Sequence, residues 1–260
     1  ERVNERFAEL AAPLIEPDDV VWVHDYHLIP LGERLRTRGN KNRIGFFLHI
    51  PWPPTRLFVS LPYHERLVRT MLQYDLVGFQ TQEWLDSFLH YCTKELGAEV
   101  DEATGSVTLD GRTVTAKAYP IGIDWDHFHA QGDSGESRQA EQRLLSSTRH
   151  RIAMIGVDRL DYSKGLPERI DGIGRFFDQH PERVRDLVYI QVAPPSREDV
   201  ESYQQIRALL EQKTGQINGA RSEVDVVPIR YVNRGYTHAQ LYGFFRAAKI
   251  GLVTPLRDGM

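Results

Sequence analysis

The sequence predicts an α/β protein that is built from parallel sheets and divided into two halves. Three observations support this prediction. Short apolar runs rich in β-branched residues recur along the 260-residue chain. Longer segments with helical periodicity separate these runs, and such alternation is typical of parallel sheets. A polar stretch, AQGDSGESRQAEQRLLSSTR (130–149), interrupts the alternation and separates the halves.

The predicted strands form two sets of four. Several are continuous apolar runs, as expected for strands that are covered on both faces. The VTLDGRTVTAK stretch holds an Asp-Gly pair between alternating runs, which predicts a hairpin within the first half. The first set comprises residues 20–25, 43–50, 76–81 and 115–123, and the second comprises 151–157, 187–193, 224–230 and 250–255.

Segments with helical periodicity connect the strands, and several of them stop at Gly or Pro, as helices often do. We expect the domain junction within 124–135, followed by a linking helix. The predicted domains are therefore residues 1–128 and 129–260. Two α/β domains would place a ligand cleft between them, outside the carboxyl ends of their strands.

The composition is that of an ordinary globular protein, with 41% hydrophobic residues, 26% charged residues and a net charge of −4. It shows no basic excess, so we expect no nucleic-acid partner. The basic residues are dispersed and no long apolar run occurs, so we expect no membrane partner. The single cysteine, Cys92, forms no intramolecular disulfide and is expected to be buried, which favours a cytoplasmic location.

Arg159 and Lys164 lie five residues apart in VDRLDYSKGL, between a predicted strand and a predicted helix. Free backbone N–H groups at a helix start favour anions, and an arginine suits phosphate oxygens. Alternatively, Arg159 pairs with Asp158 or Asp161 at the surface. The chain contains neither a GxxxxGK[ST] motif nor a GxGxxG motif after a strand, which argues against a P-loop and a dinucleotide site.

Polar clusters also follow two strands of the first set. His24, Asp25 and His27 follow one strand, and His49 follows the next. These residues lack the His spacing of common zinc sites, so we predict no metal and no cofactor. Hydrogen bonding to a polar substrate and a structural role both remain open. Trp52 could stack on a sugar or pack in the core.

Two loops of the second half carry similar candidates. Arg197 follows a strand in APPSRED, although it could simply balance the charges of Glu198 and Asp199. Asp258 lies in VTPLRDGM, although Asp-Gly could be only a turn. Because all these clusters follow predicted strands, we expect a shared cleft for a phosphorylated, hydroxyl-rich ligand.

Four motifs, HDYHLIPLGERLR, GFFLHIPWPP, VDRLDYSKGLPERI and TPLRDGM, closely resemble those of the trehalose-6-phosphate synthases, in the same order. This family of retaining glycosyltransferases has the GT-B architecture of two facing Rossmann-like domains. The resemblance implies an acceptor-side domain over 1–128 and a nucleotide-sugar-binding domain over 129–260. It also implies glucose transfer from UDP-glucose to glucose 6-phosphate with retention, giving trehalose 6-phosphate and UDP for osmoprotection.

The resemblance further implies roles for individual residues. The expected donor-binding residues are Arg159 and Lys164 at the diphosphate, His49 and Asp258 at the glucose, and Tyr236 near the base. The expected acceptor-binding residues are Asp25 at the hydroxyls and Arg197 at the phosphate. Asp25, His49, Arg159, Lys164 and Asp258 form the expected catalytic set. A front-face mechanism is implied, in which the leaving phosphate oxygen helps to take the acceptor proton and no side chain acts as a nucleophile.

Several alternatives remain open. Similar motifs are expected in a glucosylglycerol-phosphate synthase, a pseudo-glycosyltransferase and a non-catalytic regulatory paralogue. The lack of a GxGxxG motif after a strand argues against a dinucleotide-dependent oxidoreductase. A homo-oligomer is also left open. The chain starts within a helical pattern and stops after a strand, so we expect a fragment that is truncated at both ends and inactive alone.

Overall fold

The computed structural model describes residues 1–149, 151–196 and 199–258. These residues form two compact units, 1–122 and 123–258. The division falls six residues before the predicted boundary of 128/129. The reason is helix α6 (Trp125–Gly132), whose Phe128 ring packs 4.4 Å from the Tyr242 ring of α10 (His238–Ala247) in the second unit.

The first unit contains a six-stranded sheet in the order β1-β2-β3-β6-β5-β4. The first four strands in this order are parallel, and the last two pairs are antiparallel. The predicted Asp-Gly hairpin is confirmed, since Asp110 and Gly111 have φ values of 51° and 78° and connect β5 to β6. The strands are β1 (Val20–His24), β2 (Arg43–Leu48), β3 (Leu76–Phe79), β4 (Glu99–Asp101), β5 (Ser106–Leu109) and β6 (Arg112–Ala118).

Five α-helices of the first unit accompany this sheet. The Thr81 side chain caps the longest, α5, by accepting a hydrogen bond from the Trp84 amide, and Gly97 ends it at φ 65°. The core includes Phe46, Phe88 and Cys92, which are all fully or almost fully buried. The α-helices are α1 (Arg2–Ala11), α2 (Leu31–Thr37), α3 (Thr55–Phe58), α4 (His64–Met71) and α5 (Gln82–Leu96), and the 3₁₀ helices are η1 (Ala12–Leu14) and η2 (Tyr26–Leu28).

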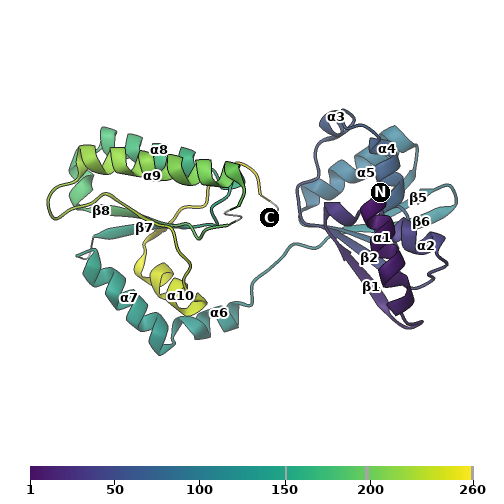
Figure 1. Cartoon of the computed structure of the whole chain (residues 1–260), viewed down its shortest axis with the longest axis horizontal. Helices are drawn as coiled ribbons and strands as arrows, with labels where there is room; N and C mark the ends of the chain where they lie inside the picture. Colours follow the sequence, from purple (N-terminus) through teal and green to yellow (C-terminus); the bar gives the residue numbers. More distant parts are fainter. Residues whose placement is uncertain (150, 197–198, 259–260) are drawn as a thin grey trace. The chain divides into compact units, whose positions relative to one another are not determined.

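The second unit contains a parallel sheet in the order β10-β7-β8-β9. Helices α8 and α9 cover one face, while α7 and α10 lie against the other (Figure 1). All six residues of β8 are buried, as expected for a strand covered on both faces. The remaining elements are α7 (Gly135–Ser147), β7 (Ile152–Val157), η3 (Tyr162–Lys164), α8 (Leu166–Gln179), η4 (Pro181–Arg185), β8 (Leu187–Val192), α9 (Glu201–Arg221), β9 (Ile229–Val232) and β10 (Ile250–Gly251).

Two predicted strands of this unit have different bounds in the structure. The strand expected at 224–230 is β9, which starts only at Ile229. Pro228 directly precedes it and cannot donate to a sheet, although its carbonyl accepts a hydrogen bond from the Tyr189 amide at 2.8 Å. The strand expected at 250–255 ends at Gly251, and the following residues form a loop. In the described ranges, no helix combines the length and apolar character that crossing a membrane requires.

Candidate active site

In the first unit, the parallel pairing of β1 with β2 brings His24, Asp25 and His49 together. His24 pairs in register with Phe47, so the strands end side by side. His24 Nδ1 and His49 Nε2 share a hydrogen bond of 2.9 Å, and the His49 amide donates to Asp25 Oδ1 at 3.4 Å. One imidazole nitrogen donates and the other accepts, so this bond fixes how the two rings face each other.

The backbone of Asp25 is strained. Its φ of 70° and ψ of 164° lie in a region that is almost restricted to glycine, where an L-residue costs roughly 1–3 kcal/mol. The Asp25 amide donates to Phe47 O at 2.8 Å, and the Leu28 amide donates to Asp25 O at 3.1 Å. These bonds hold the strained residue at the end of β1. The HDYH motif contains no glycine, so nothing in the motif indicates this conformation.

Two tryptophans near these strands behave differently. Trp22 was not among the predicted site residues, yet its ring is 67% exposed and its centroid lies 4.3 Å from that of His24. Their spacing of two residues on a strand could have placed both on one face. Trp52 is 3% exposed and packs against Phe58 and Phe88. Trp52 therefore packs in the core, which was one of its two predicted roles.

In the second unit, Arg159 and Asp161 lie on the loop after β7. Arg159 Nη2 contacts Asp161 Oδ2 at 3.2 Å, so the predicted pairing with Asp161 is present. Asp161 is almost buried and also accepts hydrogen bonds from the Ser163 amide and hydroxyl, both at 3.0 Å. The Arg159 side chain nevertheless remains 60% exposed. A fixed carboxylate thus holds a guanidinium that is still accessible to an anion.

Lys164 and Asp258 are 94 positions apart and form an ion pair. Their side chains are only 15% and 24% exposed. Gly165 makes this approach possible, because its φ is 62° and a Cβ there would lie 2.6 Å from Thr254 O. Asp258 is therefore more than a turn residue, and Lys164 ends η3, two residues before α8 begins.

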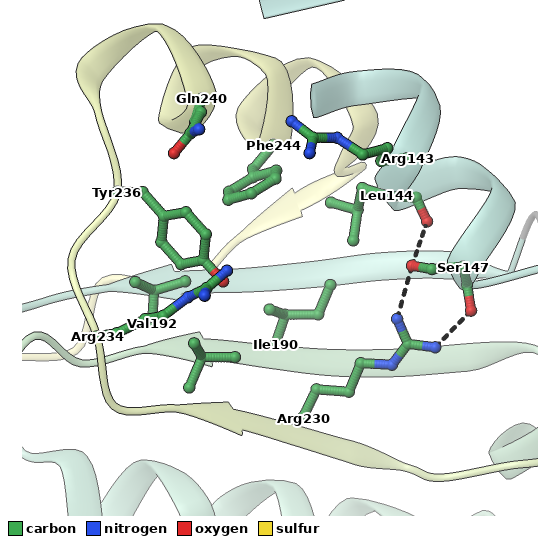
Figure 2. Close-up of a pocket in the computed structure, with 11 residues that line it drawn as sticks. Arg143, Leu144, Ser147, Ile190, Val192, Arg230, Arg234, Tyr236, Gln240 and Phe244 are labelled. Carbon is green, nitrogen blue, oxygen red and sulfur yellow. Dashed lines mark hydrogen bonds between the residues drawn. The ribbon is translucent and has the colours of Figure 1, made fainter. Parts of the chain in front are cut away.

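Tyr236 lines a cavity of about 310 Å³ on the face of the sheet that α7 and α10 cover. The Arg234 guanidinium lies 4.7 Å from the Tyr236 ring centroid, and Arg230 reaches from β9 to Ser147 (Figure 2). Burial lowers the pKa of the Arg230 guanidinium. The lining residues that the structure describes include three arginines and no acid: Arg143, Leu144, Ser147, Ile190, Val192, Arg230, Val232, Arg234, Tyr236, Gln240 and Phe244.

The predicted site residues are divided between the two units. Asp25 and His49 belong to the first unit, and Arg159, Lys164 and Asp258 belong to the second, as does Tyr236. Arg197 lies outside the described residues. Within the described part of the chain, no three His, Cys, Asp or Glu side chains are arranged to hold a metal ion.

The chain can be compared with known proteins. The family model for Glycosyltransferase family 20 matches residues 1–260. Trehalose-6-phosphate synthase of Sinorhizobium fredii is 43% identical over 258 residues, which are 99% of this chain and 55% of that protein. The corresponding protein of an Enterobacter species is 41% identical over 100% of this chain and 54% of its own length. The chain therefore spans about half the length of these relatives.

Solved structures give the same picture. A Burkholderia xenovorans alpha,alpha-trehalose-phosphate synthase (UDP-forming) in complex with glucose-6-phosphate matches with a TM-score of 0.93 and 42% identity, over 100% of this chain and 57% of that one. An Escherichia coli structure with bound UDP-2-fluoro glucose matches with a TM-score of 0.92 and 39% identity, again over 100% and 57%. The predicted α/β fold with parallel sheets is thereby confirmed.

Proposed function

This chain belongs to glycosyltransferase family 20, and on that premise we propose that the whole protein transfers glucose from UDP-glucose to glucose 6-phosphate. The products are trehalose 6-phosphate and UDP, with retention at the anomeric carbon. One observation carries the proposal. The loop after β7 supplies Arg159 and Lys164, and the loop after the neighbouring strand β10 supplies Asp258, which pairs with Lys164.

We propose that the second unit binds the donor. The Arg159 guanidinium and the Lys164 ammonium bind oxygens of the donor diphosphate, and the Asp258 carboxylate accepts hydrogen bonds from glucose hydroxyls. The Tyr236 cavity, with its aromatic and aliphatic walls, takes the nucleotide base. The arginines that line it favour the adjoining phosphates, since no acid among the described lining residues opposes them.

The first unit is proposed to bind the acceptor. The Asp25 carboxylate accepts hydrogen bonds from the hydroxyls of glucose 6-phosphate, and His49 contacts the glucose of the donor. Arg197, which belongs to the second half of the chain, binds the acceptor phosphate in this proposal. The imidazole pair and the single carboxylate suit hydroxyl groups, which both donate and accept hydrogen bonds.

The chemistry follows from where charge develops. The bond between the anomeric carbon and the diphosphate oxygen breaks, so negative charge grows on the leaving phosphate. Arg159 and Lys164 stabilise the transition state, in which this charge has developed, more strongly than the ground state. This difference lowers the barrier. On the same face of the sugar, the acceptor oxygen bonds to the anomeric carbon and passes its proton to a leaving phosphate oxygen. Retention then needs no side-chain nucleophile.

The single Cys92 and the phosphorylated substrates support a cytoplasmic location. We propose UDP-glucose and glucose 6-phosphate as partners, without a nucleic acid. The net charge of −4 supports the last point, since nucleic-acid binding generally uses an excess of basic residues.

The test is UDP release from UDP-glucose by the full-length protein in EDTA, with glucose 6-phosphate or glycerol 3-phosphate as acceptor. We expect turnover with glucose 6-phosphate and loss of about 100-fold or more in Arg159→Ala. Anomeric proton couplings of the product, read by NMR, report the stereochemistry. Turnover with glycerol 3-phosphate alone would move the protein to the glucosylglycerol-phosphate activity, and a lack of release with either acceptor would contradict the proposal.

A further inference from the structure

Arg169 is a buried cation that lies below the proposed donor site. It belongs to α8, five residues after Lys164, and its side chain is 2% exposed. Charged side chains are almost never this deeply buried unless they are paired, because removing a charge from water is costly. The contacts of Arg169 therefore indicate why the fold retains it.

The guanidinium of Arg169 bonds in three directions. Nη1 donates to Asp158 Oδ2 at 2.5 Å, next to Arg159 in the chain. Nε donates to Thr254 Oγ1 at 2.8 Å, four residues before Asp258. Nη2 makes a longer contact with the carbonyl of Lys164, at 3.4 Å. One planar group thus contacts each of the chain segments that carry Arg159, Lys164 and Asp258.

The sheet fixes the position of this guanidinium. Arg169 Nη1 also donates to Gln191 Oε1 at 3.0 Å. The side-chain nitrogen of Gln191, Nε2, donates to Gly156 O and Val192 O. The Tyr189 hydroxyl donates to the same Gln191 oxygen. A Cβ at Gly156 would lie 2.5 Å from Arg169 Nη1, so glycine leaves the space that the guanidinium occupies.

The chemistry of arginine suits this position. Burial opposes the charge, but the hydrogen bond that Arg169 donates to Asp158 and the interactions with Asp158 and Tyr189 together outweigh it, so the pKa of Arg169 is raised. A guanidinium has five N–H donors in a rigid plane, whereas lysine has a single flexible ammonium. Lysine would therefore keep the charge and lose the geometry that joins the segments.

We propose that Arg169 is a positioning residue that holds the loops after β7 and β10 in register, so that Arg159, Lys164 and Asp258 keep the spacing that a sugar diphosphate requires. Its guanidinium is buried and bonds to protein groups, so it acts through the loops rather than on the substrate. This role rests on the donor site proposed above. It follows the general need for side chains that fix a site from behind.

The first test measures loop order without any substrate. Hydrogen–deuterium exchange is followed in the full-length protein and in Arg169→Met and Arg169→Lys. We expect peptides over 158–164 and 253–258 to exchange at least about 10-fold faster in both variants, while peptides of the first unit do not change. Unchanged loop exchange, or faster exchange spread evenly over the second unit, would overturn the proposal.

The matched control is Asp171→Asn. Asp171 is also on α8 and pairs with Lys213 of α9 at 2.6 Å, so this variant removes a charge pair from the same helix without touching the loops. We expect normal loop exchange in the control. If Arg169→Met fails to fold, Thr254→Val removes only the hydrogen bond to the second loop. It should speed exchange over 253–258, and unchanged exchange there would then overturn the proposal.

The second test separates the donor from the acceptor. In Arg169→Lys, we expect kcat/KM for UDP-glucose to fall by about 100-fold, with KM for glucose 6-phosphate within about twofold. An activity loss that merely follows the folded fraction, with an unchanged donor KM, would contradict a positioning role. If the unsubstituted protein transfers no glucose, the proposed function fails, whereas the exchange experiment still decides whether Arg169 orders the loops.

Discussion

The two groups of candidate residues are held by different forces. In the first unit, a strained backbone at Asp25 and a hydrogen bond between the His24 and His49 rings set the geometry. In the second unit, ion pairs do so, namely Arg159 with Asp161 and Lys164 with Asp258. Imidazoles and a carboxylate suit sugar hydroxyls, and paired cations suit a diphosphate. The manner of support therefore reflects the proposed ligand of each unit.

The largest effect expected from this difference is at Lys164. Lys164→Ala removes a cation where charge develops and should lower kcat by about 1,000-fold, whereas binding of glucose 6-phosphate changes little. Steady-state kinetics on the full-length protein would measure both. Lys213→Ala is the control, because it breaks an ion pair of the same unit between α8 and α9. A similar loss in the control would mean that any broken ion pair disables the protein.

The strain at Asp25 predicts an unusual order of stabilities. Asp25→Gly and Asp25→Ala both lose the carboxylate, but only glycine adopts φ 70° without cost. We expect the glycine variant to be more stable by about 1–2 kcal/mol, and both variants to be nearly inactive. Urea unfolding, followed by the fluorescence of Trp52 and Trp84, would measure the difference. The reverse order would show that Asp25 is not strained.

The imidazole pair is expected to have a smaller effect. His24→Ala should lower kcat/KM by about 10-fold, because His49 loses the hydrogen bond that orients its ring. His24→Asn keeps a polar group near the Nδ1 position and should lose less. The control is His90→Ala, whose ring bonds to the Thr55 hydroxyl at 3.0 Å elsewhere in the unit. Equal activities of His24→Ala, His24→Asn and His90→Ala would show that His24 does not contribute to the site.

The smallest difference between the units concerns their titration, and it appears only at alkaline pH. Burial raises the pKa of the Cys92 thiol to about 12, from an ordinary value of 9.0. Burial also raises the pKa of tyrosines in both units from 10.0 to about 12, namely Tyr91 in the first unit and Tyr189 and Tyr231 in the second. Above its ordinary pKa, each of these groups keeps its proton in the folded protein but releases it in the unfolded chain. The free energy of unfolding therefore keeps its full value below the ordinary pKa and falls above it.

The first unit should therefore lose stability from about pH 9 upward, and the second from about pH 10, by about 1.4 kcal/mol per pH unit for each group. With Trp125 of the second unit replaced (Trp125→Phe), tryptophan fluorescence reports the first unit, and circular dichroism reports the whole chain. The early loss should vanish in Cys92→Ala. Coincident transitions of the two probes at every pH would contradict the difference.

Local sequence patterns predicted which segments form the units but not how distant side chains pair. Strands β1, β2 and β3 begin at the predicted residues because their apolar runs are buried, and that signal is local. The pairing of Lys164 with Asp258 depends on tertiary structure. The strain at Asp25 arises from bonds to the next strand, which the HDYH motif does not encode.

Other differences have equally physical reasons. The predicted boundary at 128/129 followed a change in composition, whereas packing of Phe128 on Tyr242 decides where α6 belongs. Arg169 was not predicted because a charged residue in a helical pattern normally faces water. Only its burial and its contacts with Asp158 and Thr254 distinguish it.

The ion pair between Lys164 and Asp258 has a consequence for competition inside a cell. A free phosphate that approaches Lys164 also meets the Asp258 carboxylate, and the two negative charges repel each other. A sugar diphosphate offers both a phosphate for the ammonium and hydroxyls for the carboxylate. In the proposed reaction, UDP keeps only the first of these contacts once the sugar has been transferred. The same pair would therefore reject abundant inorganic anions and promote product release.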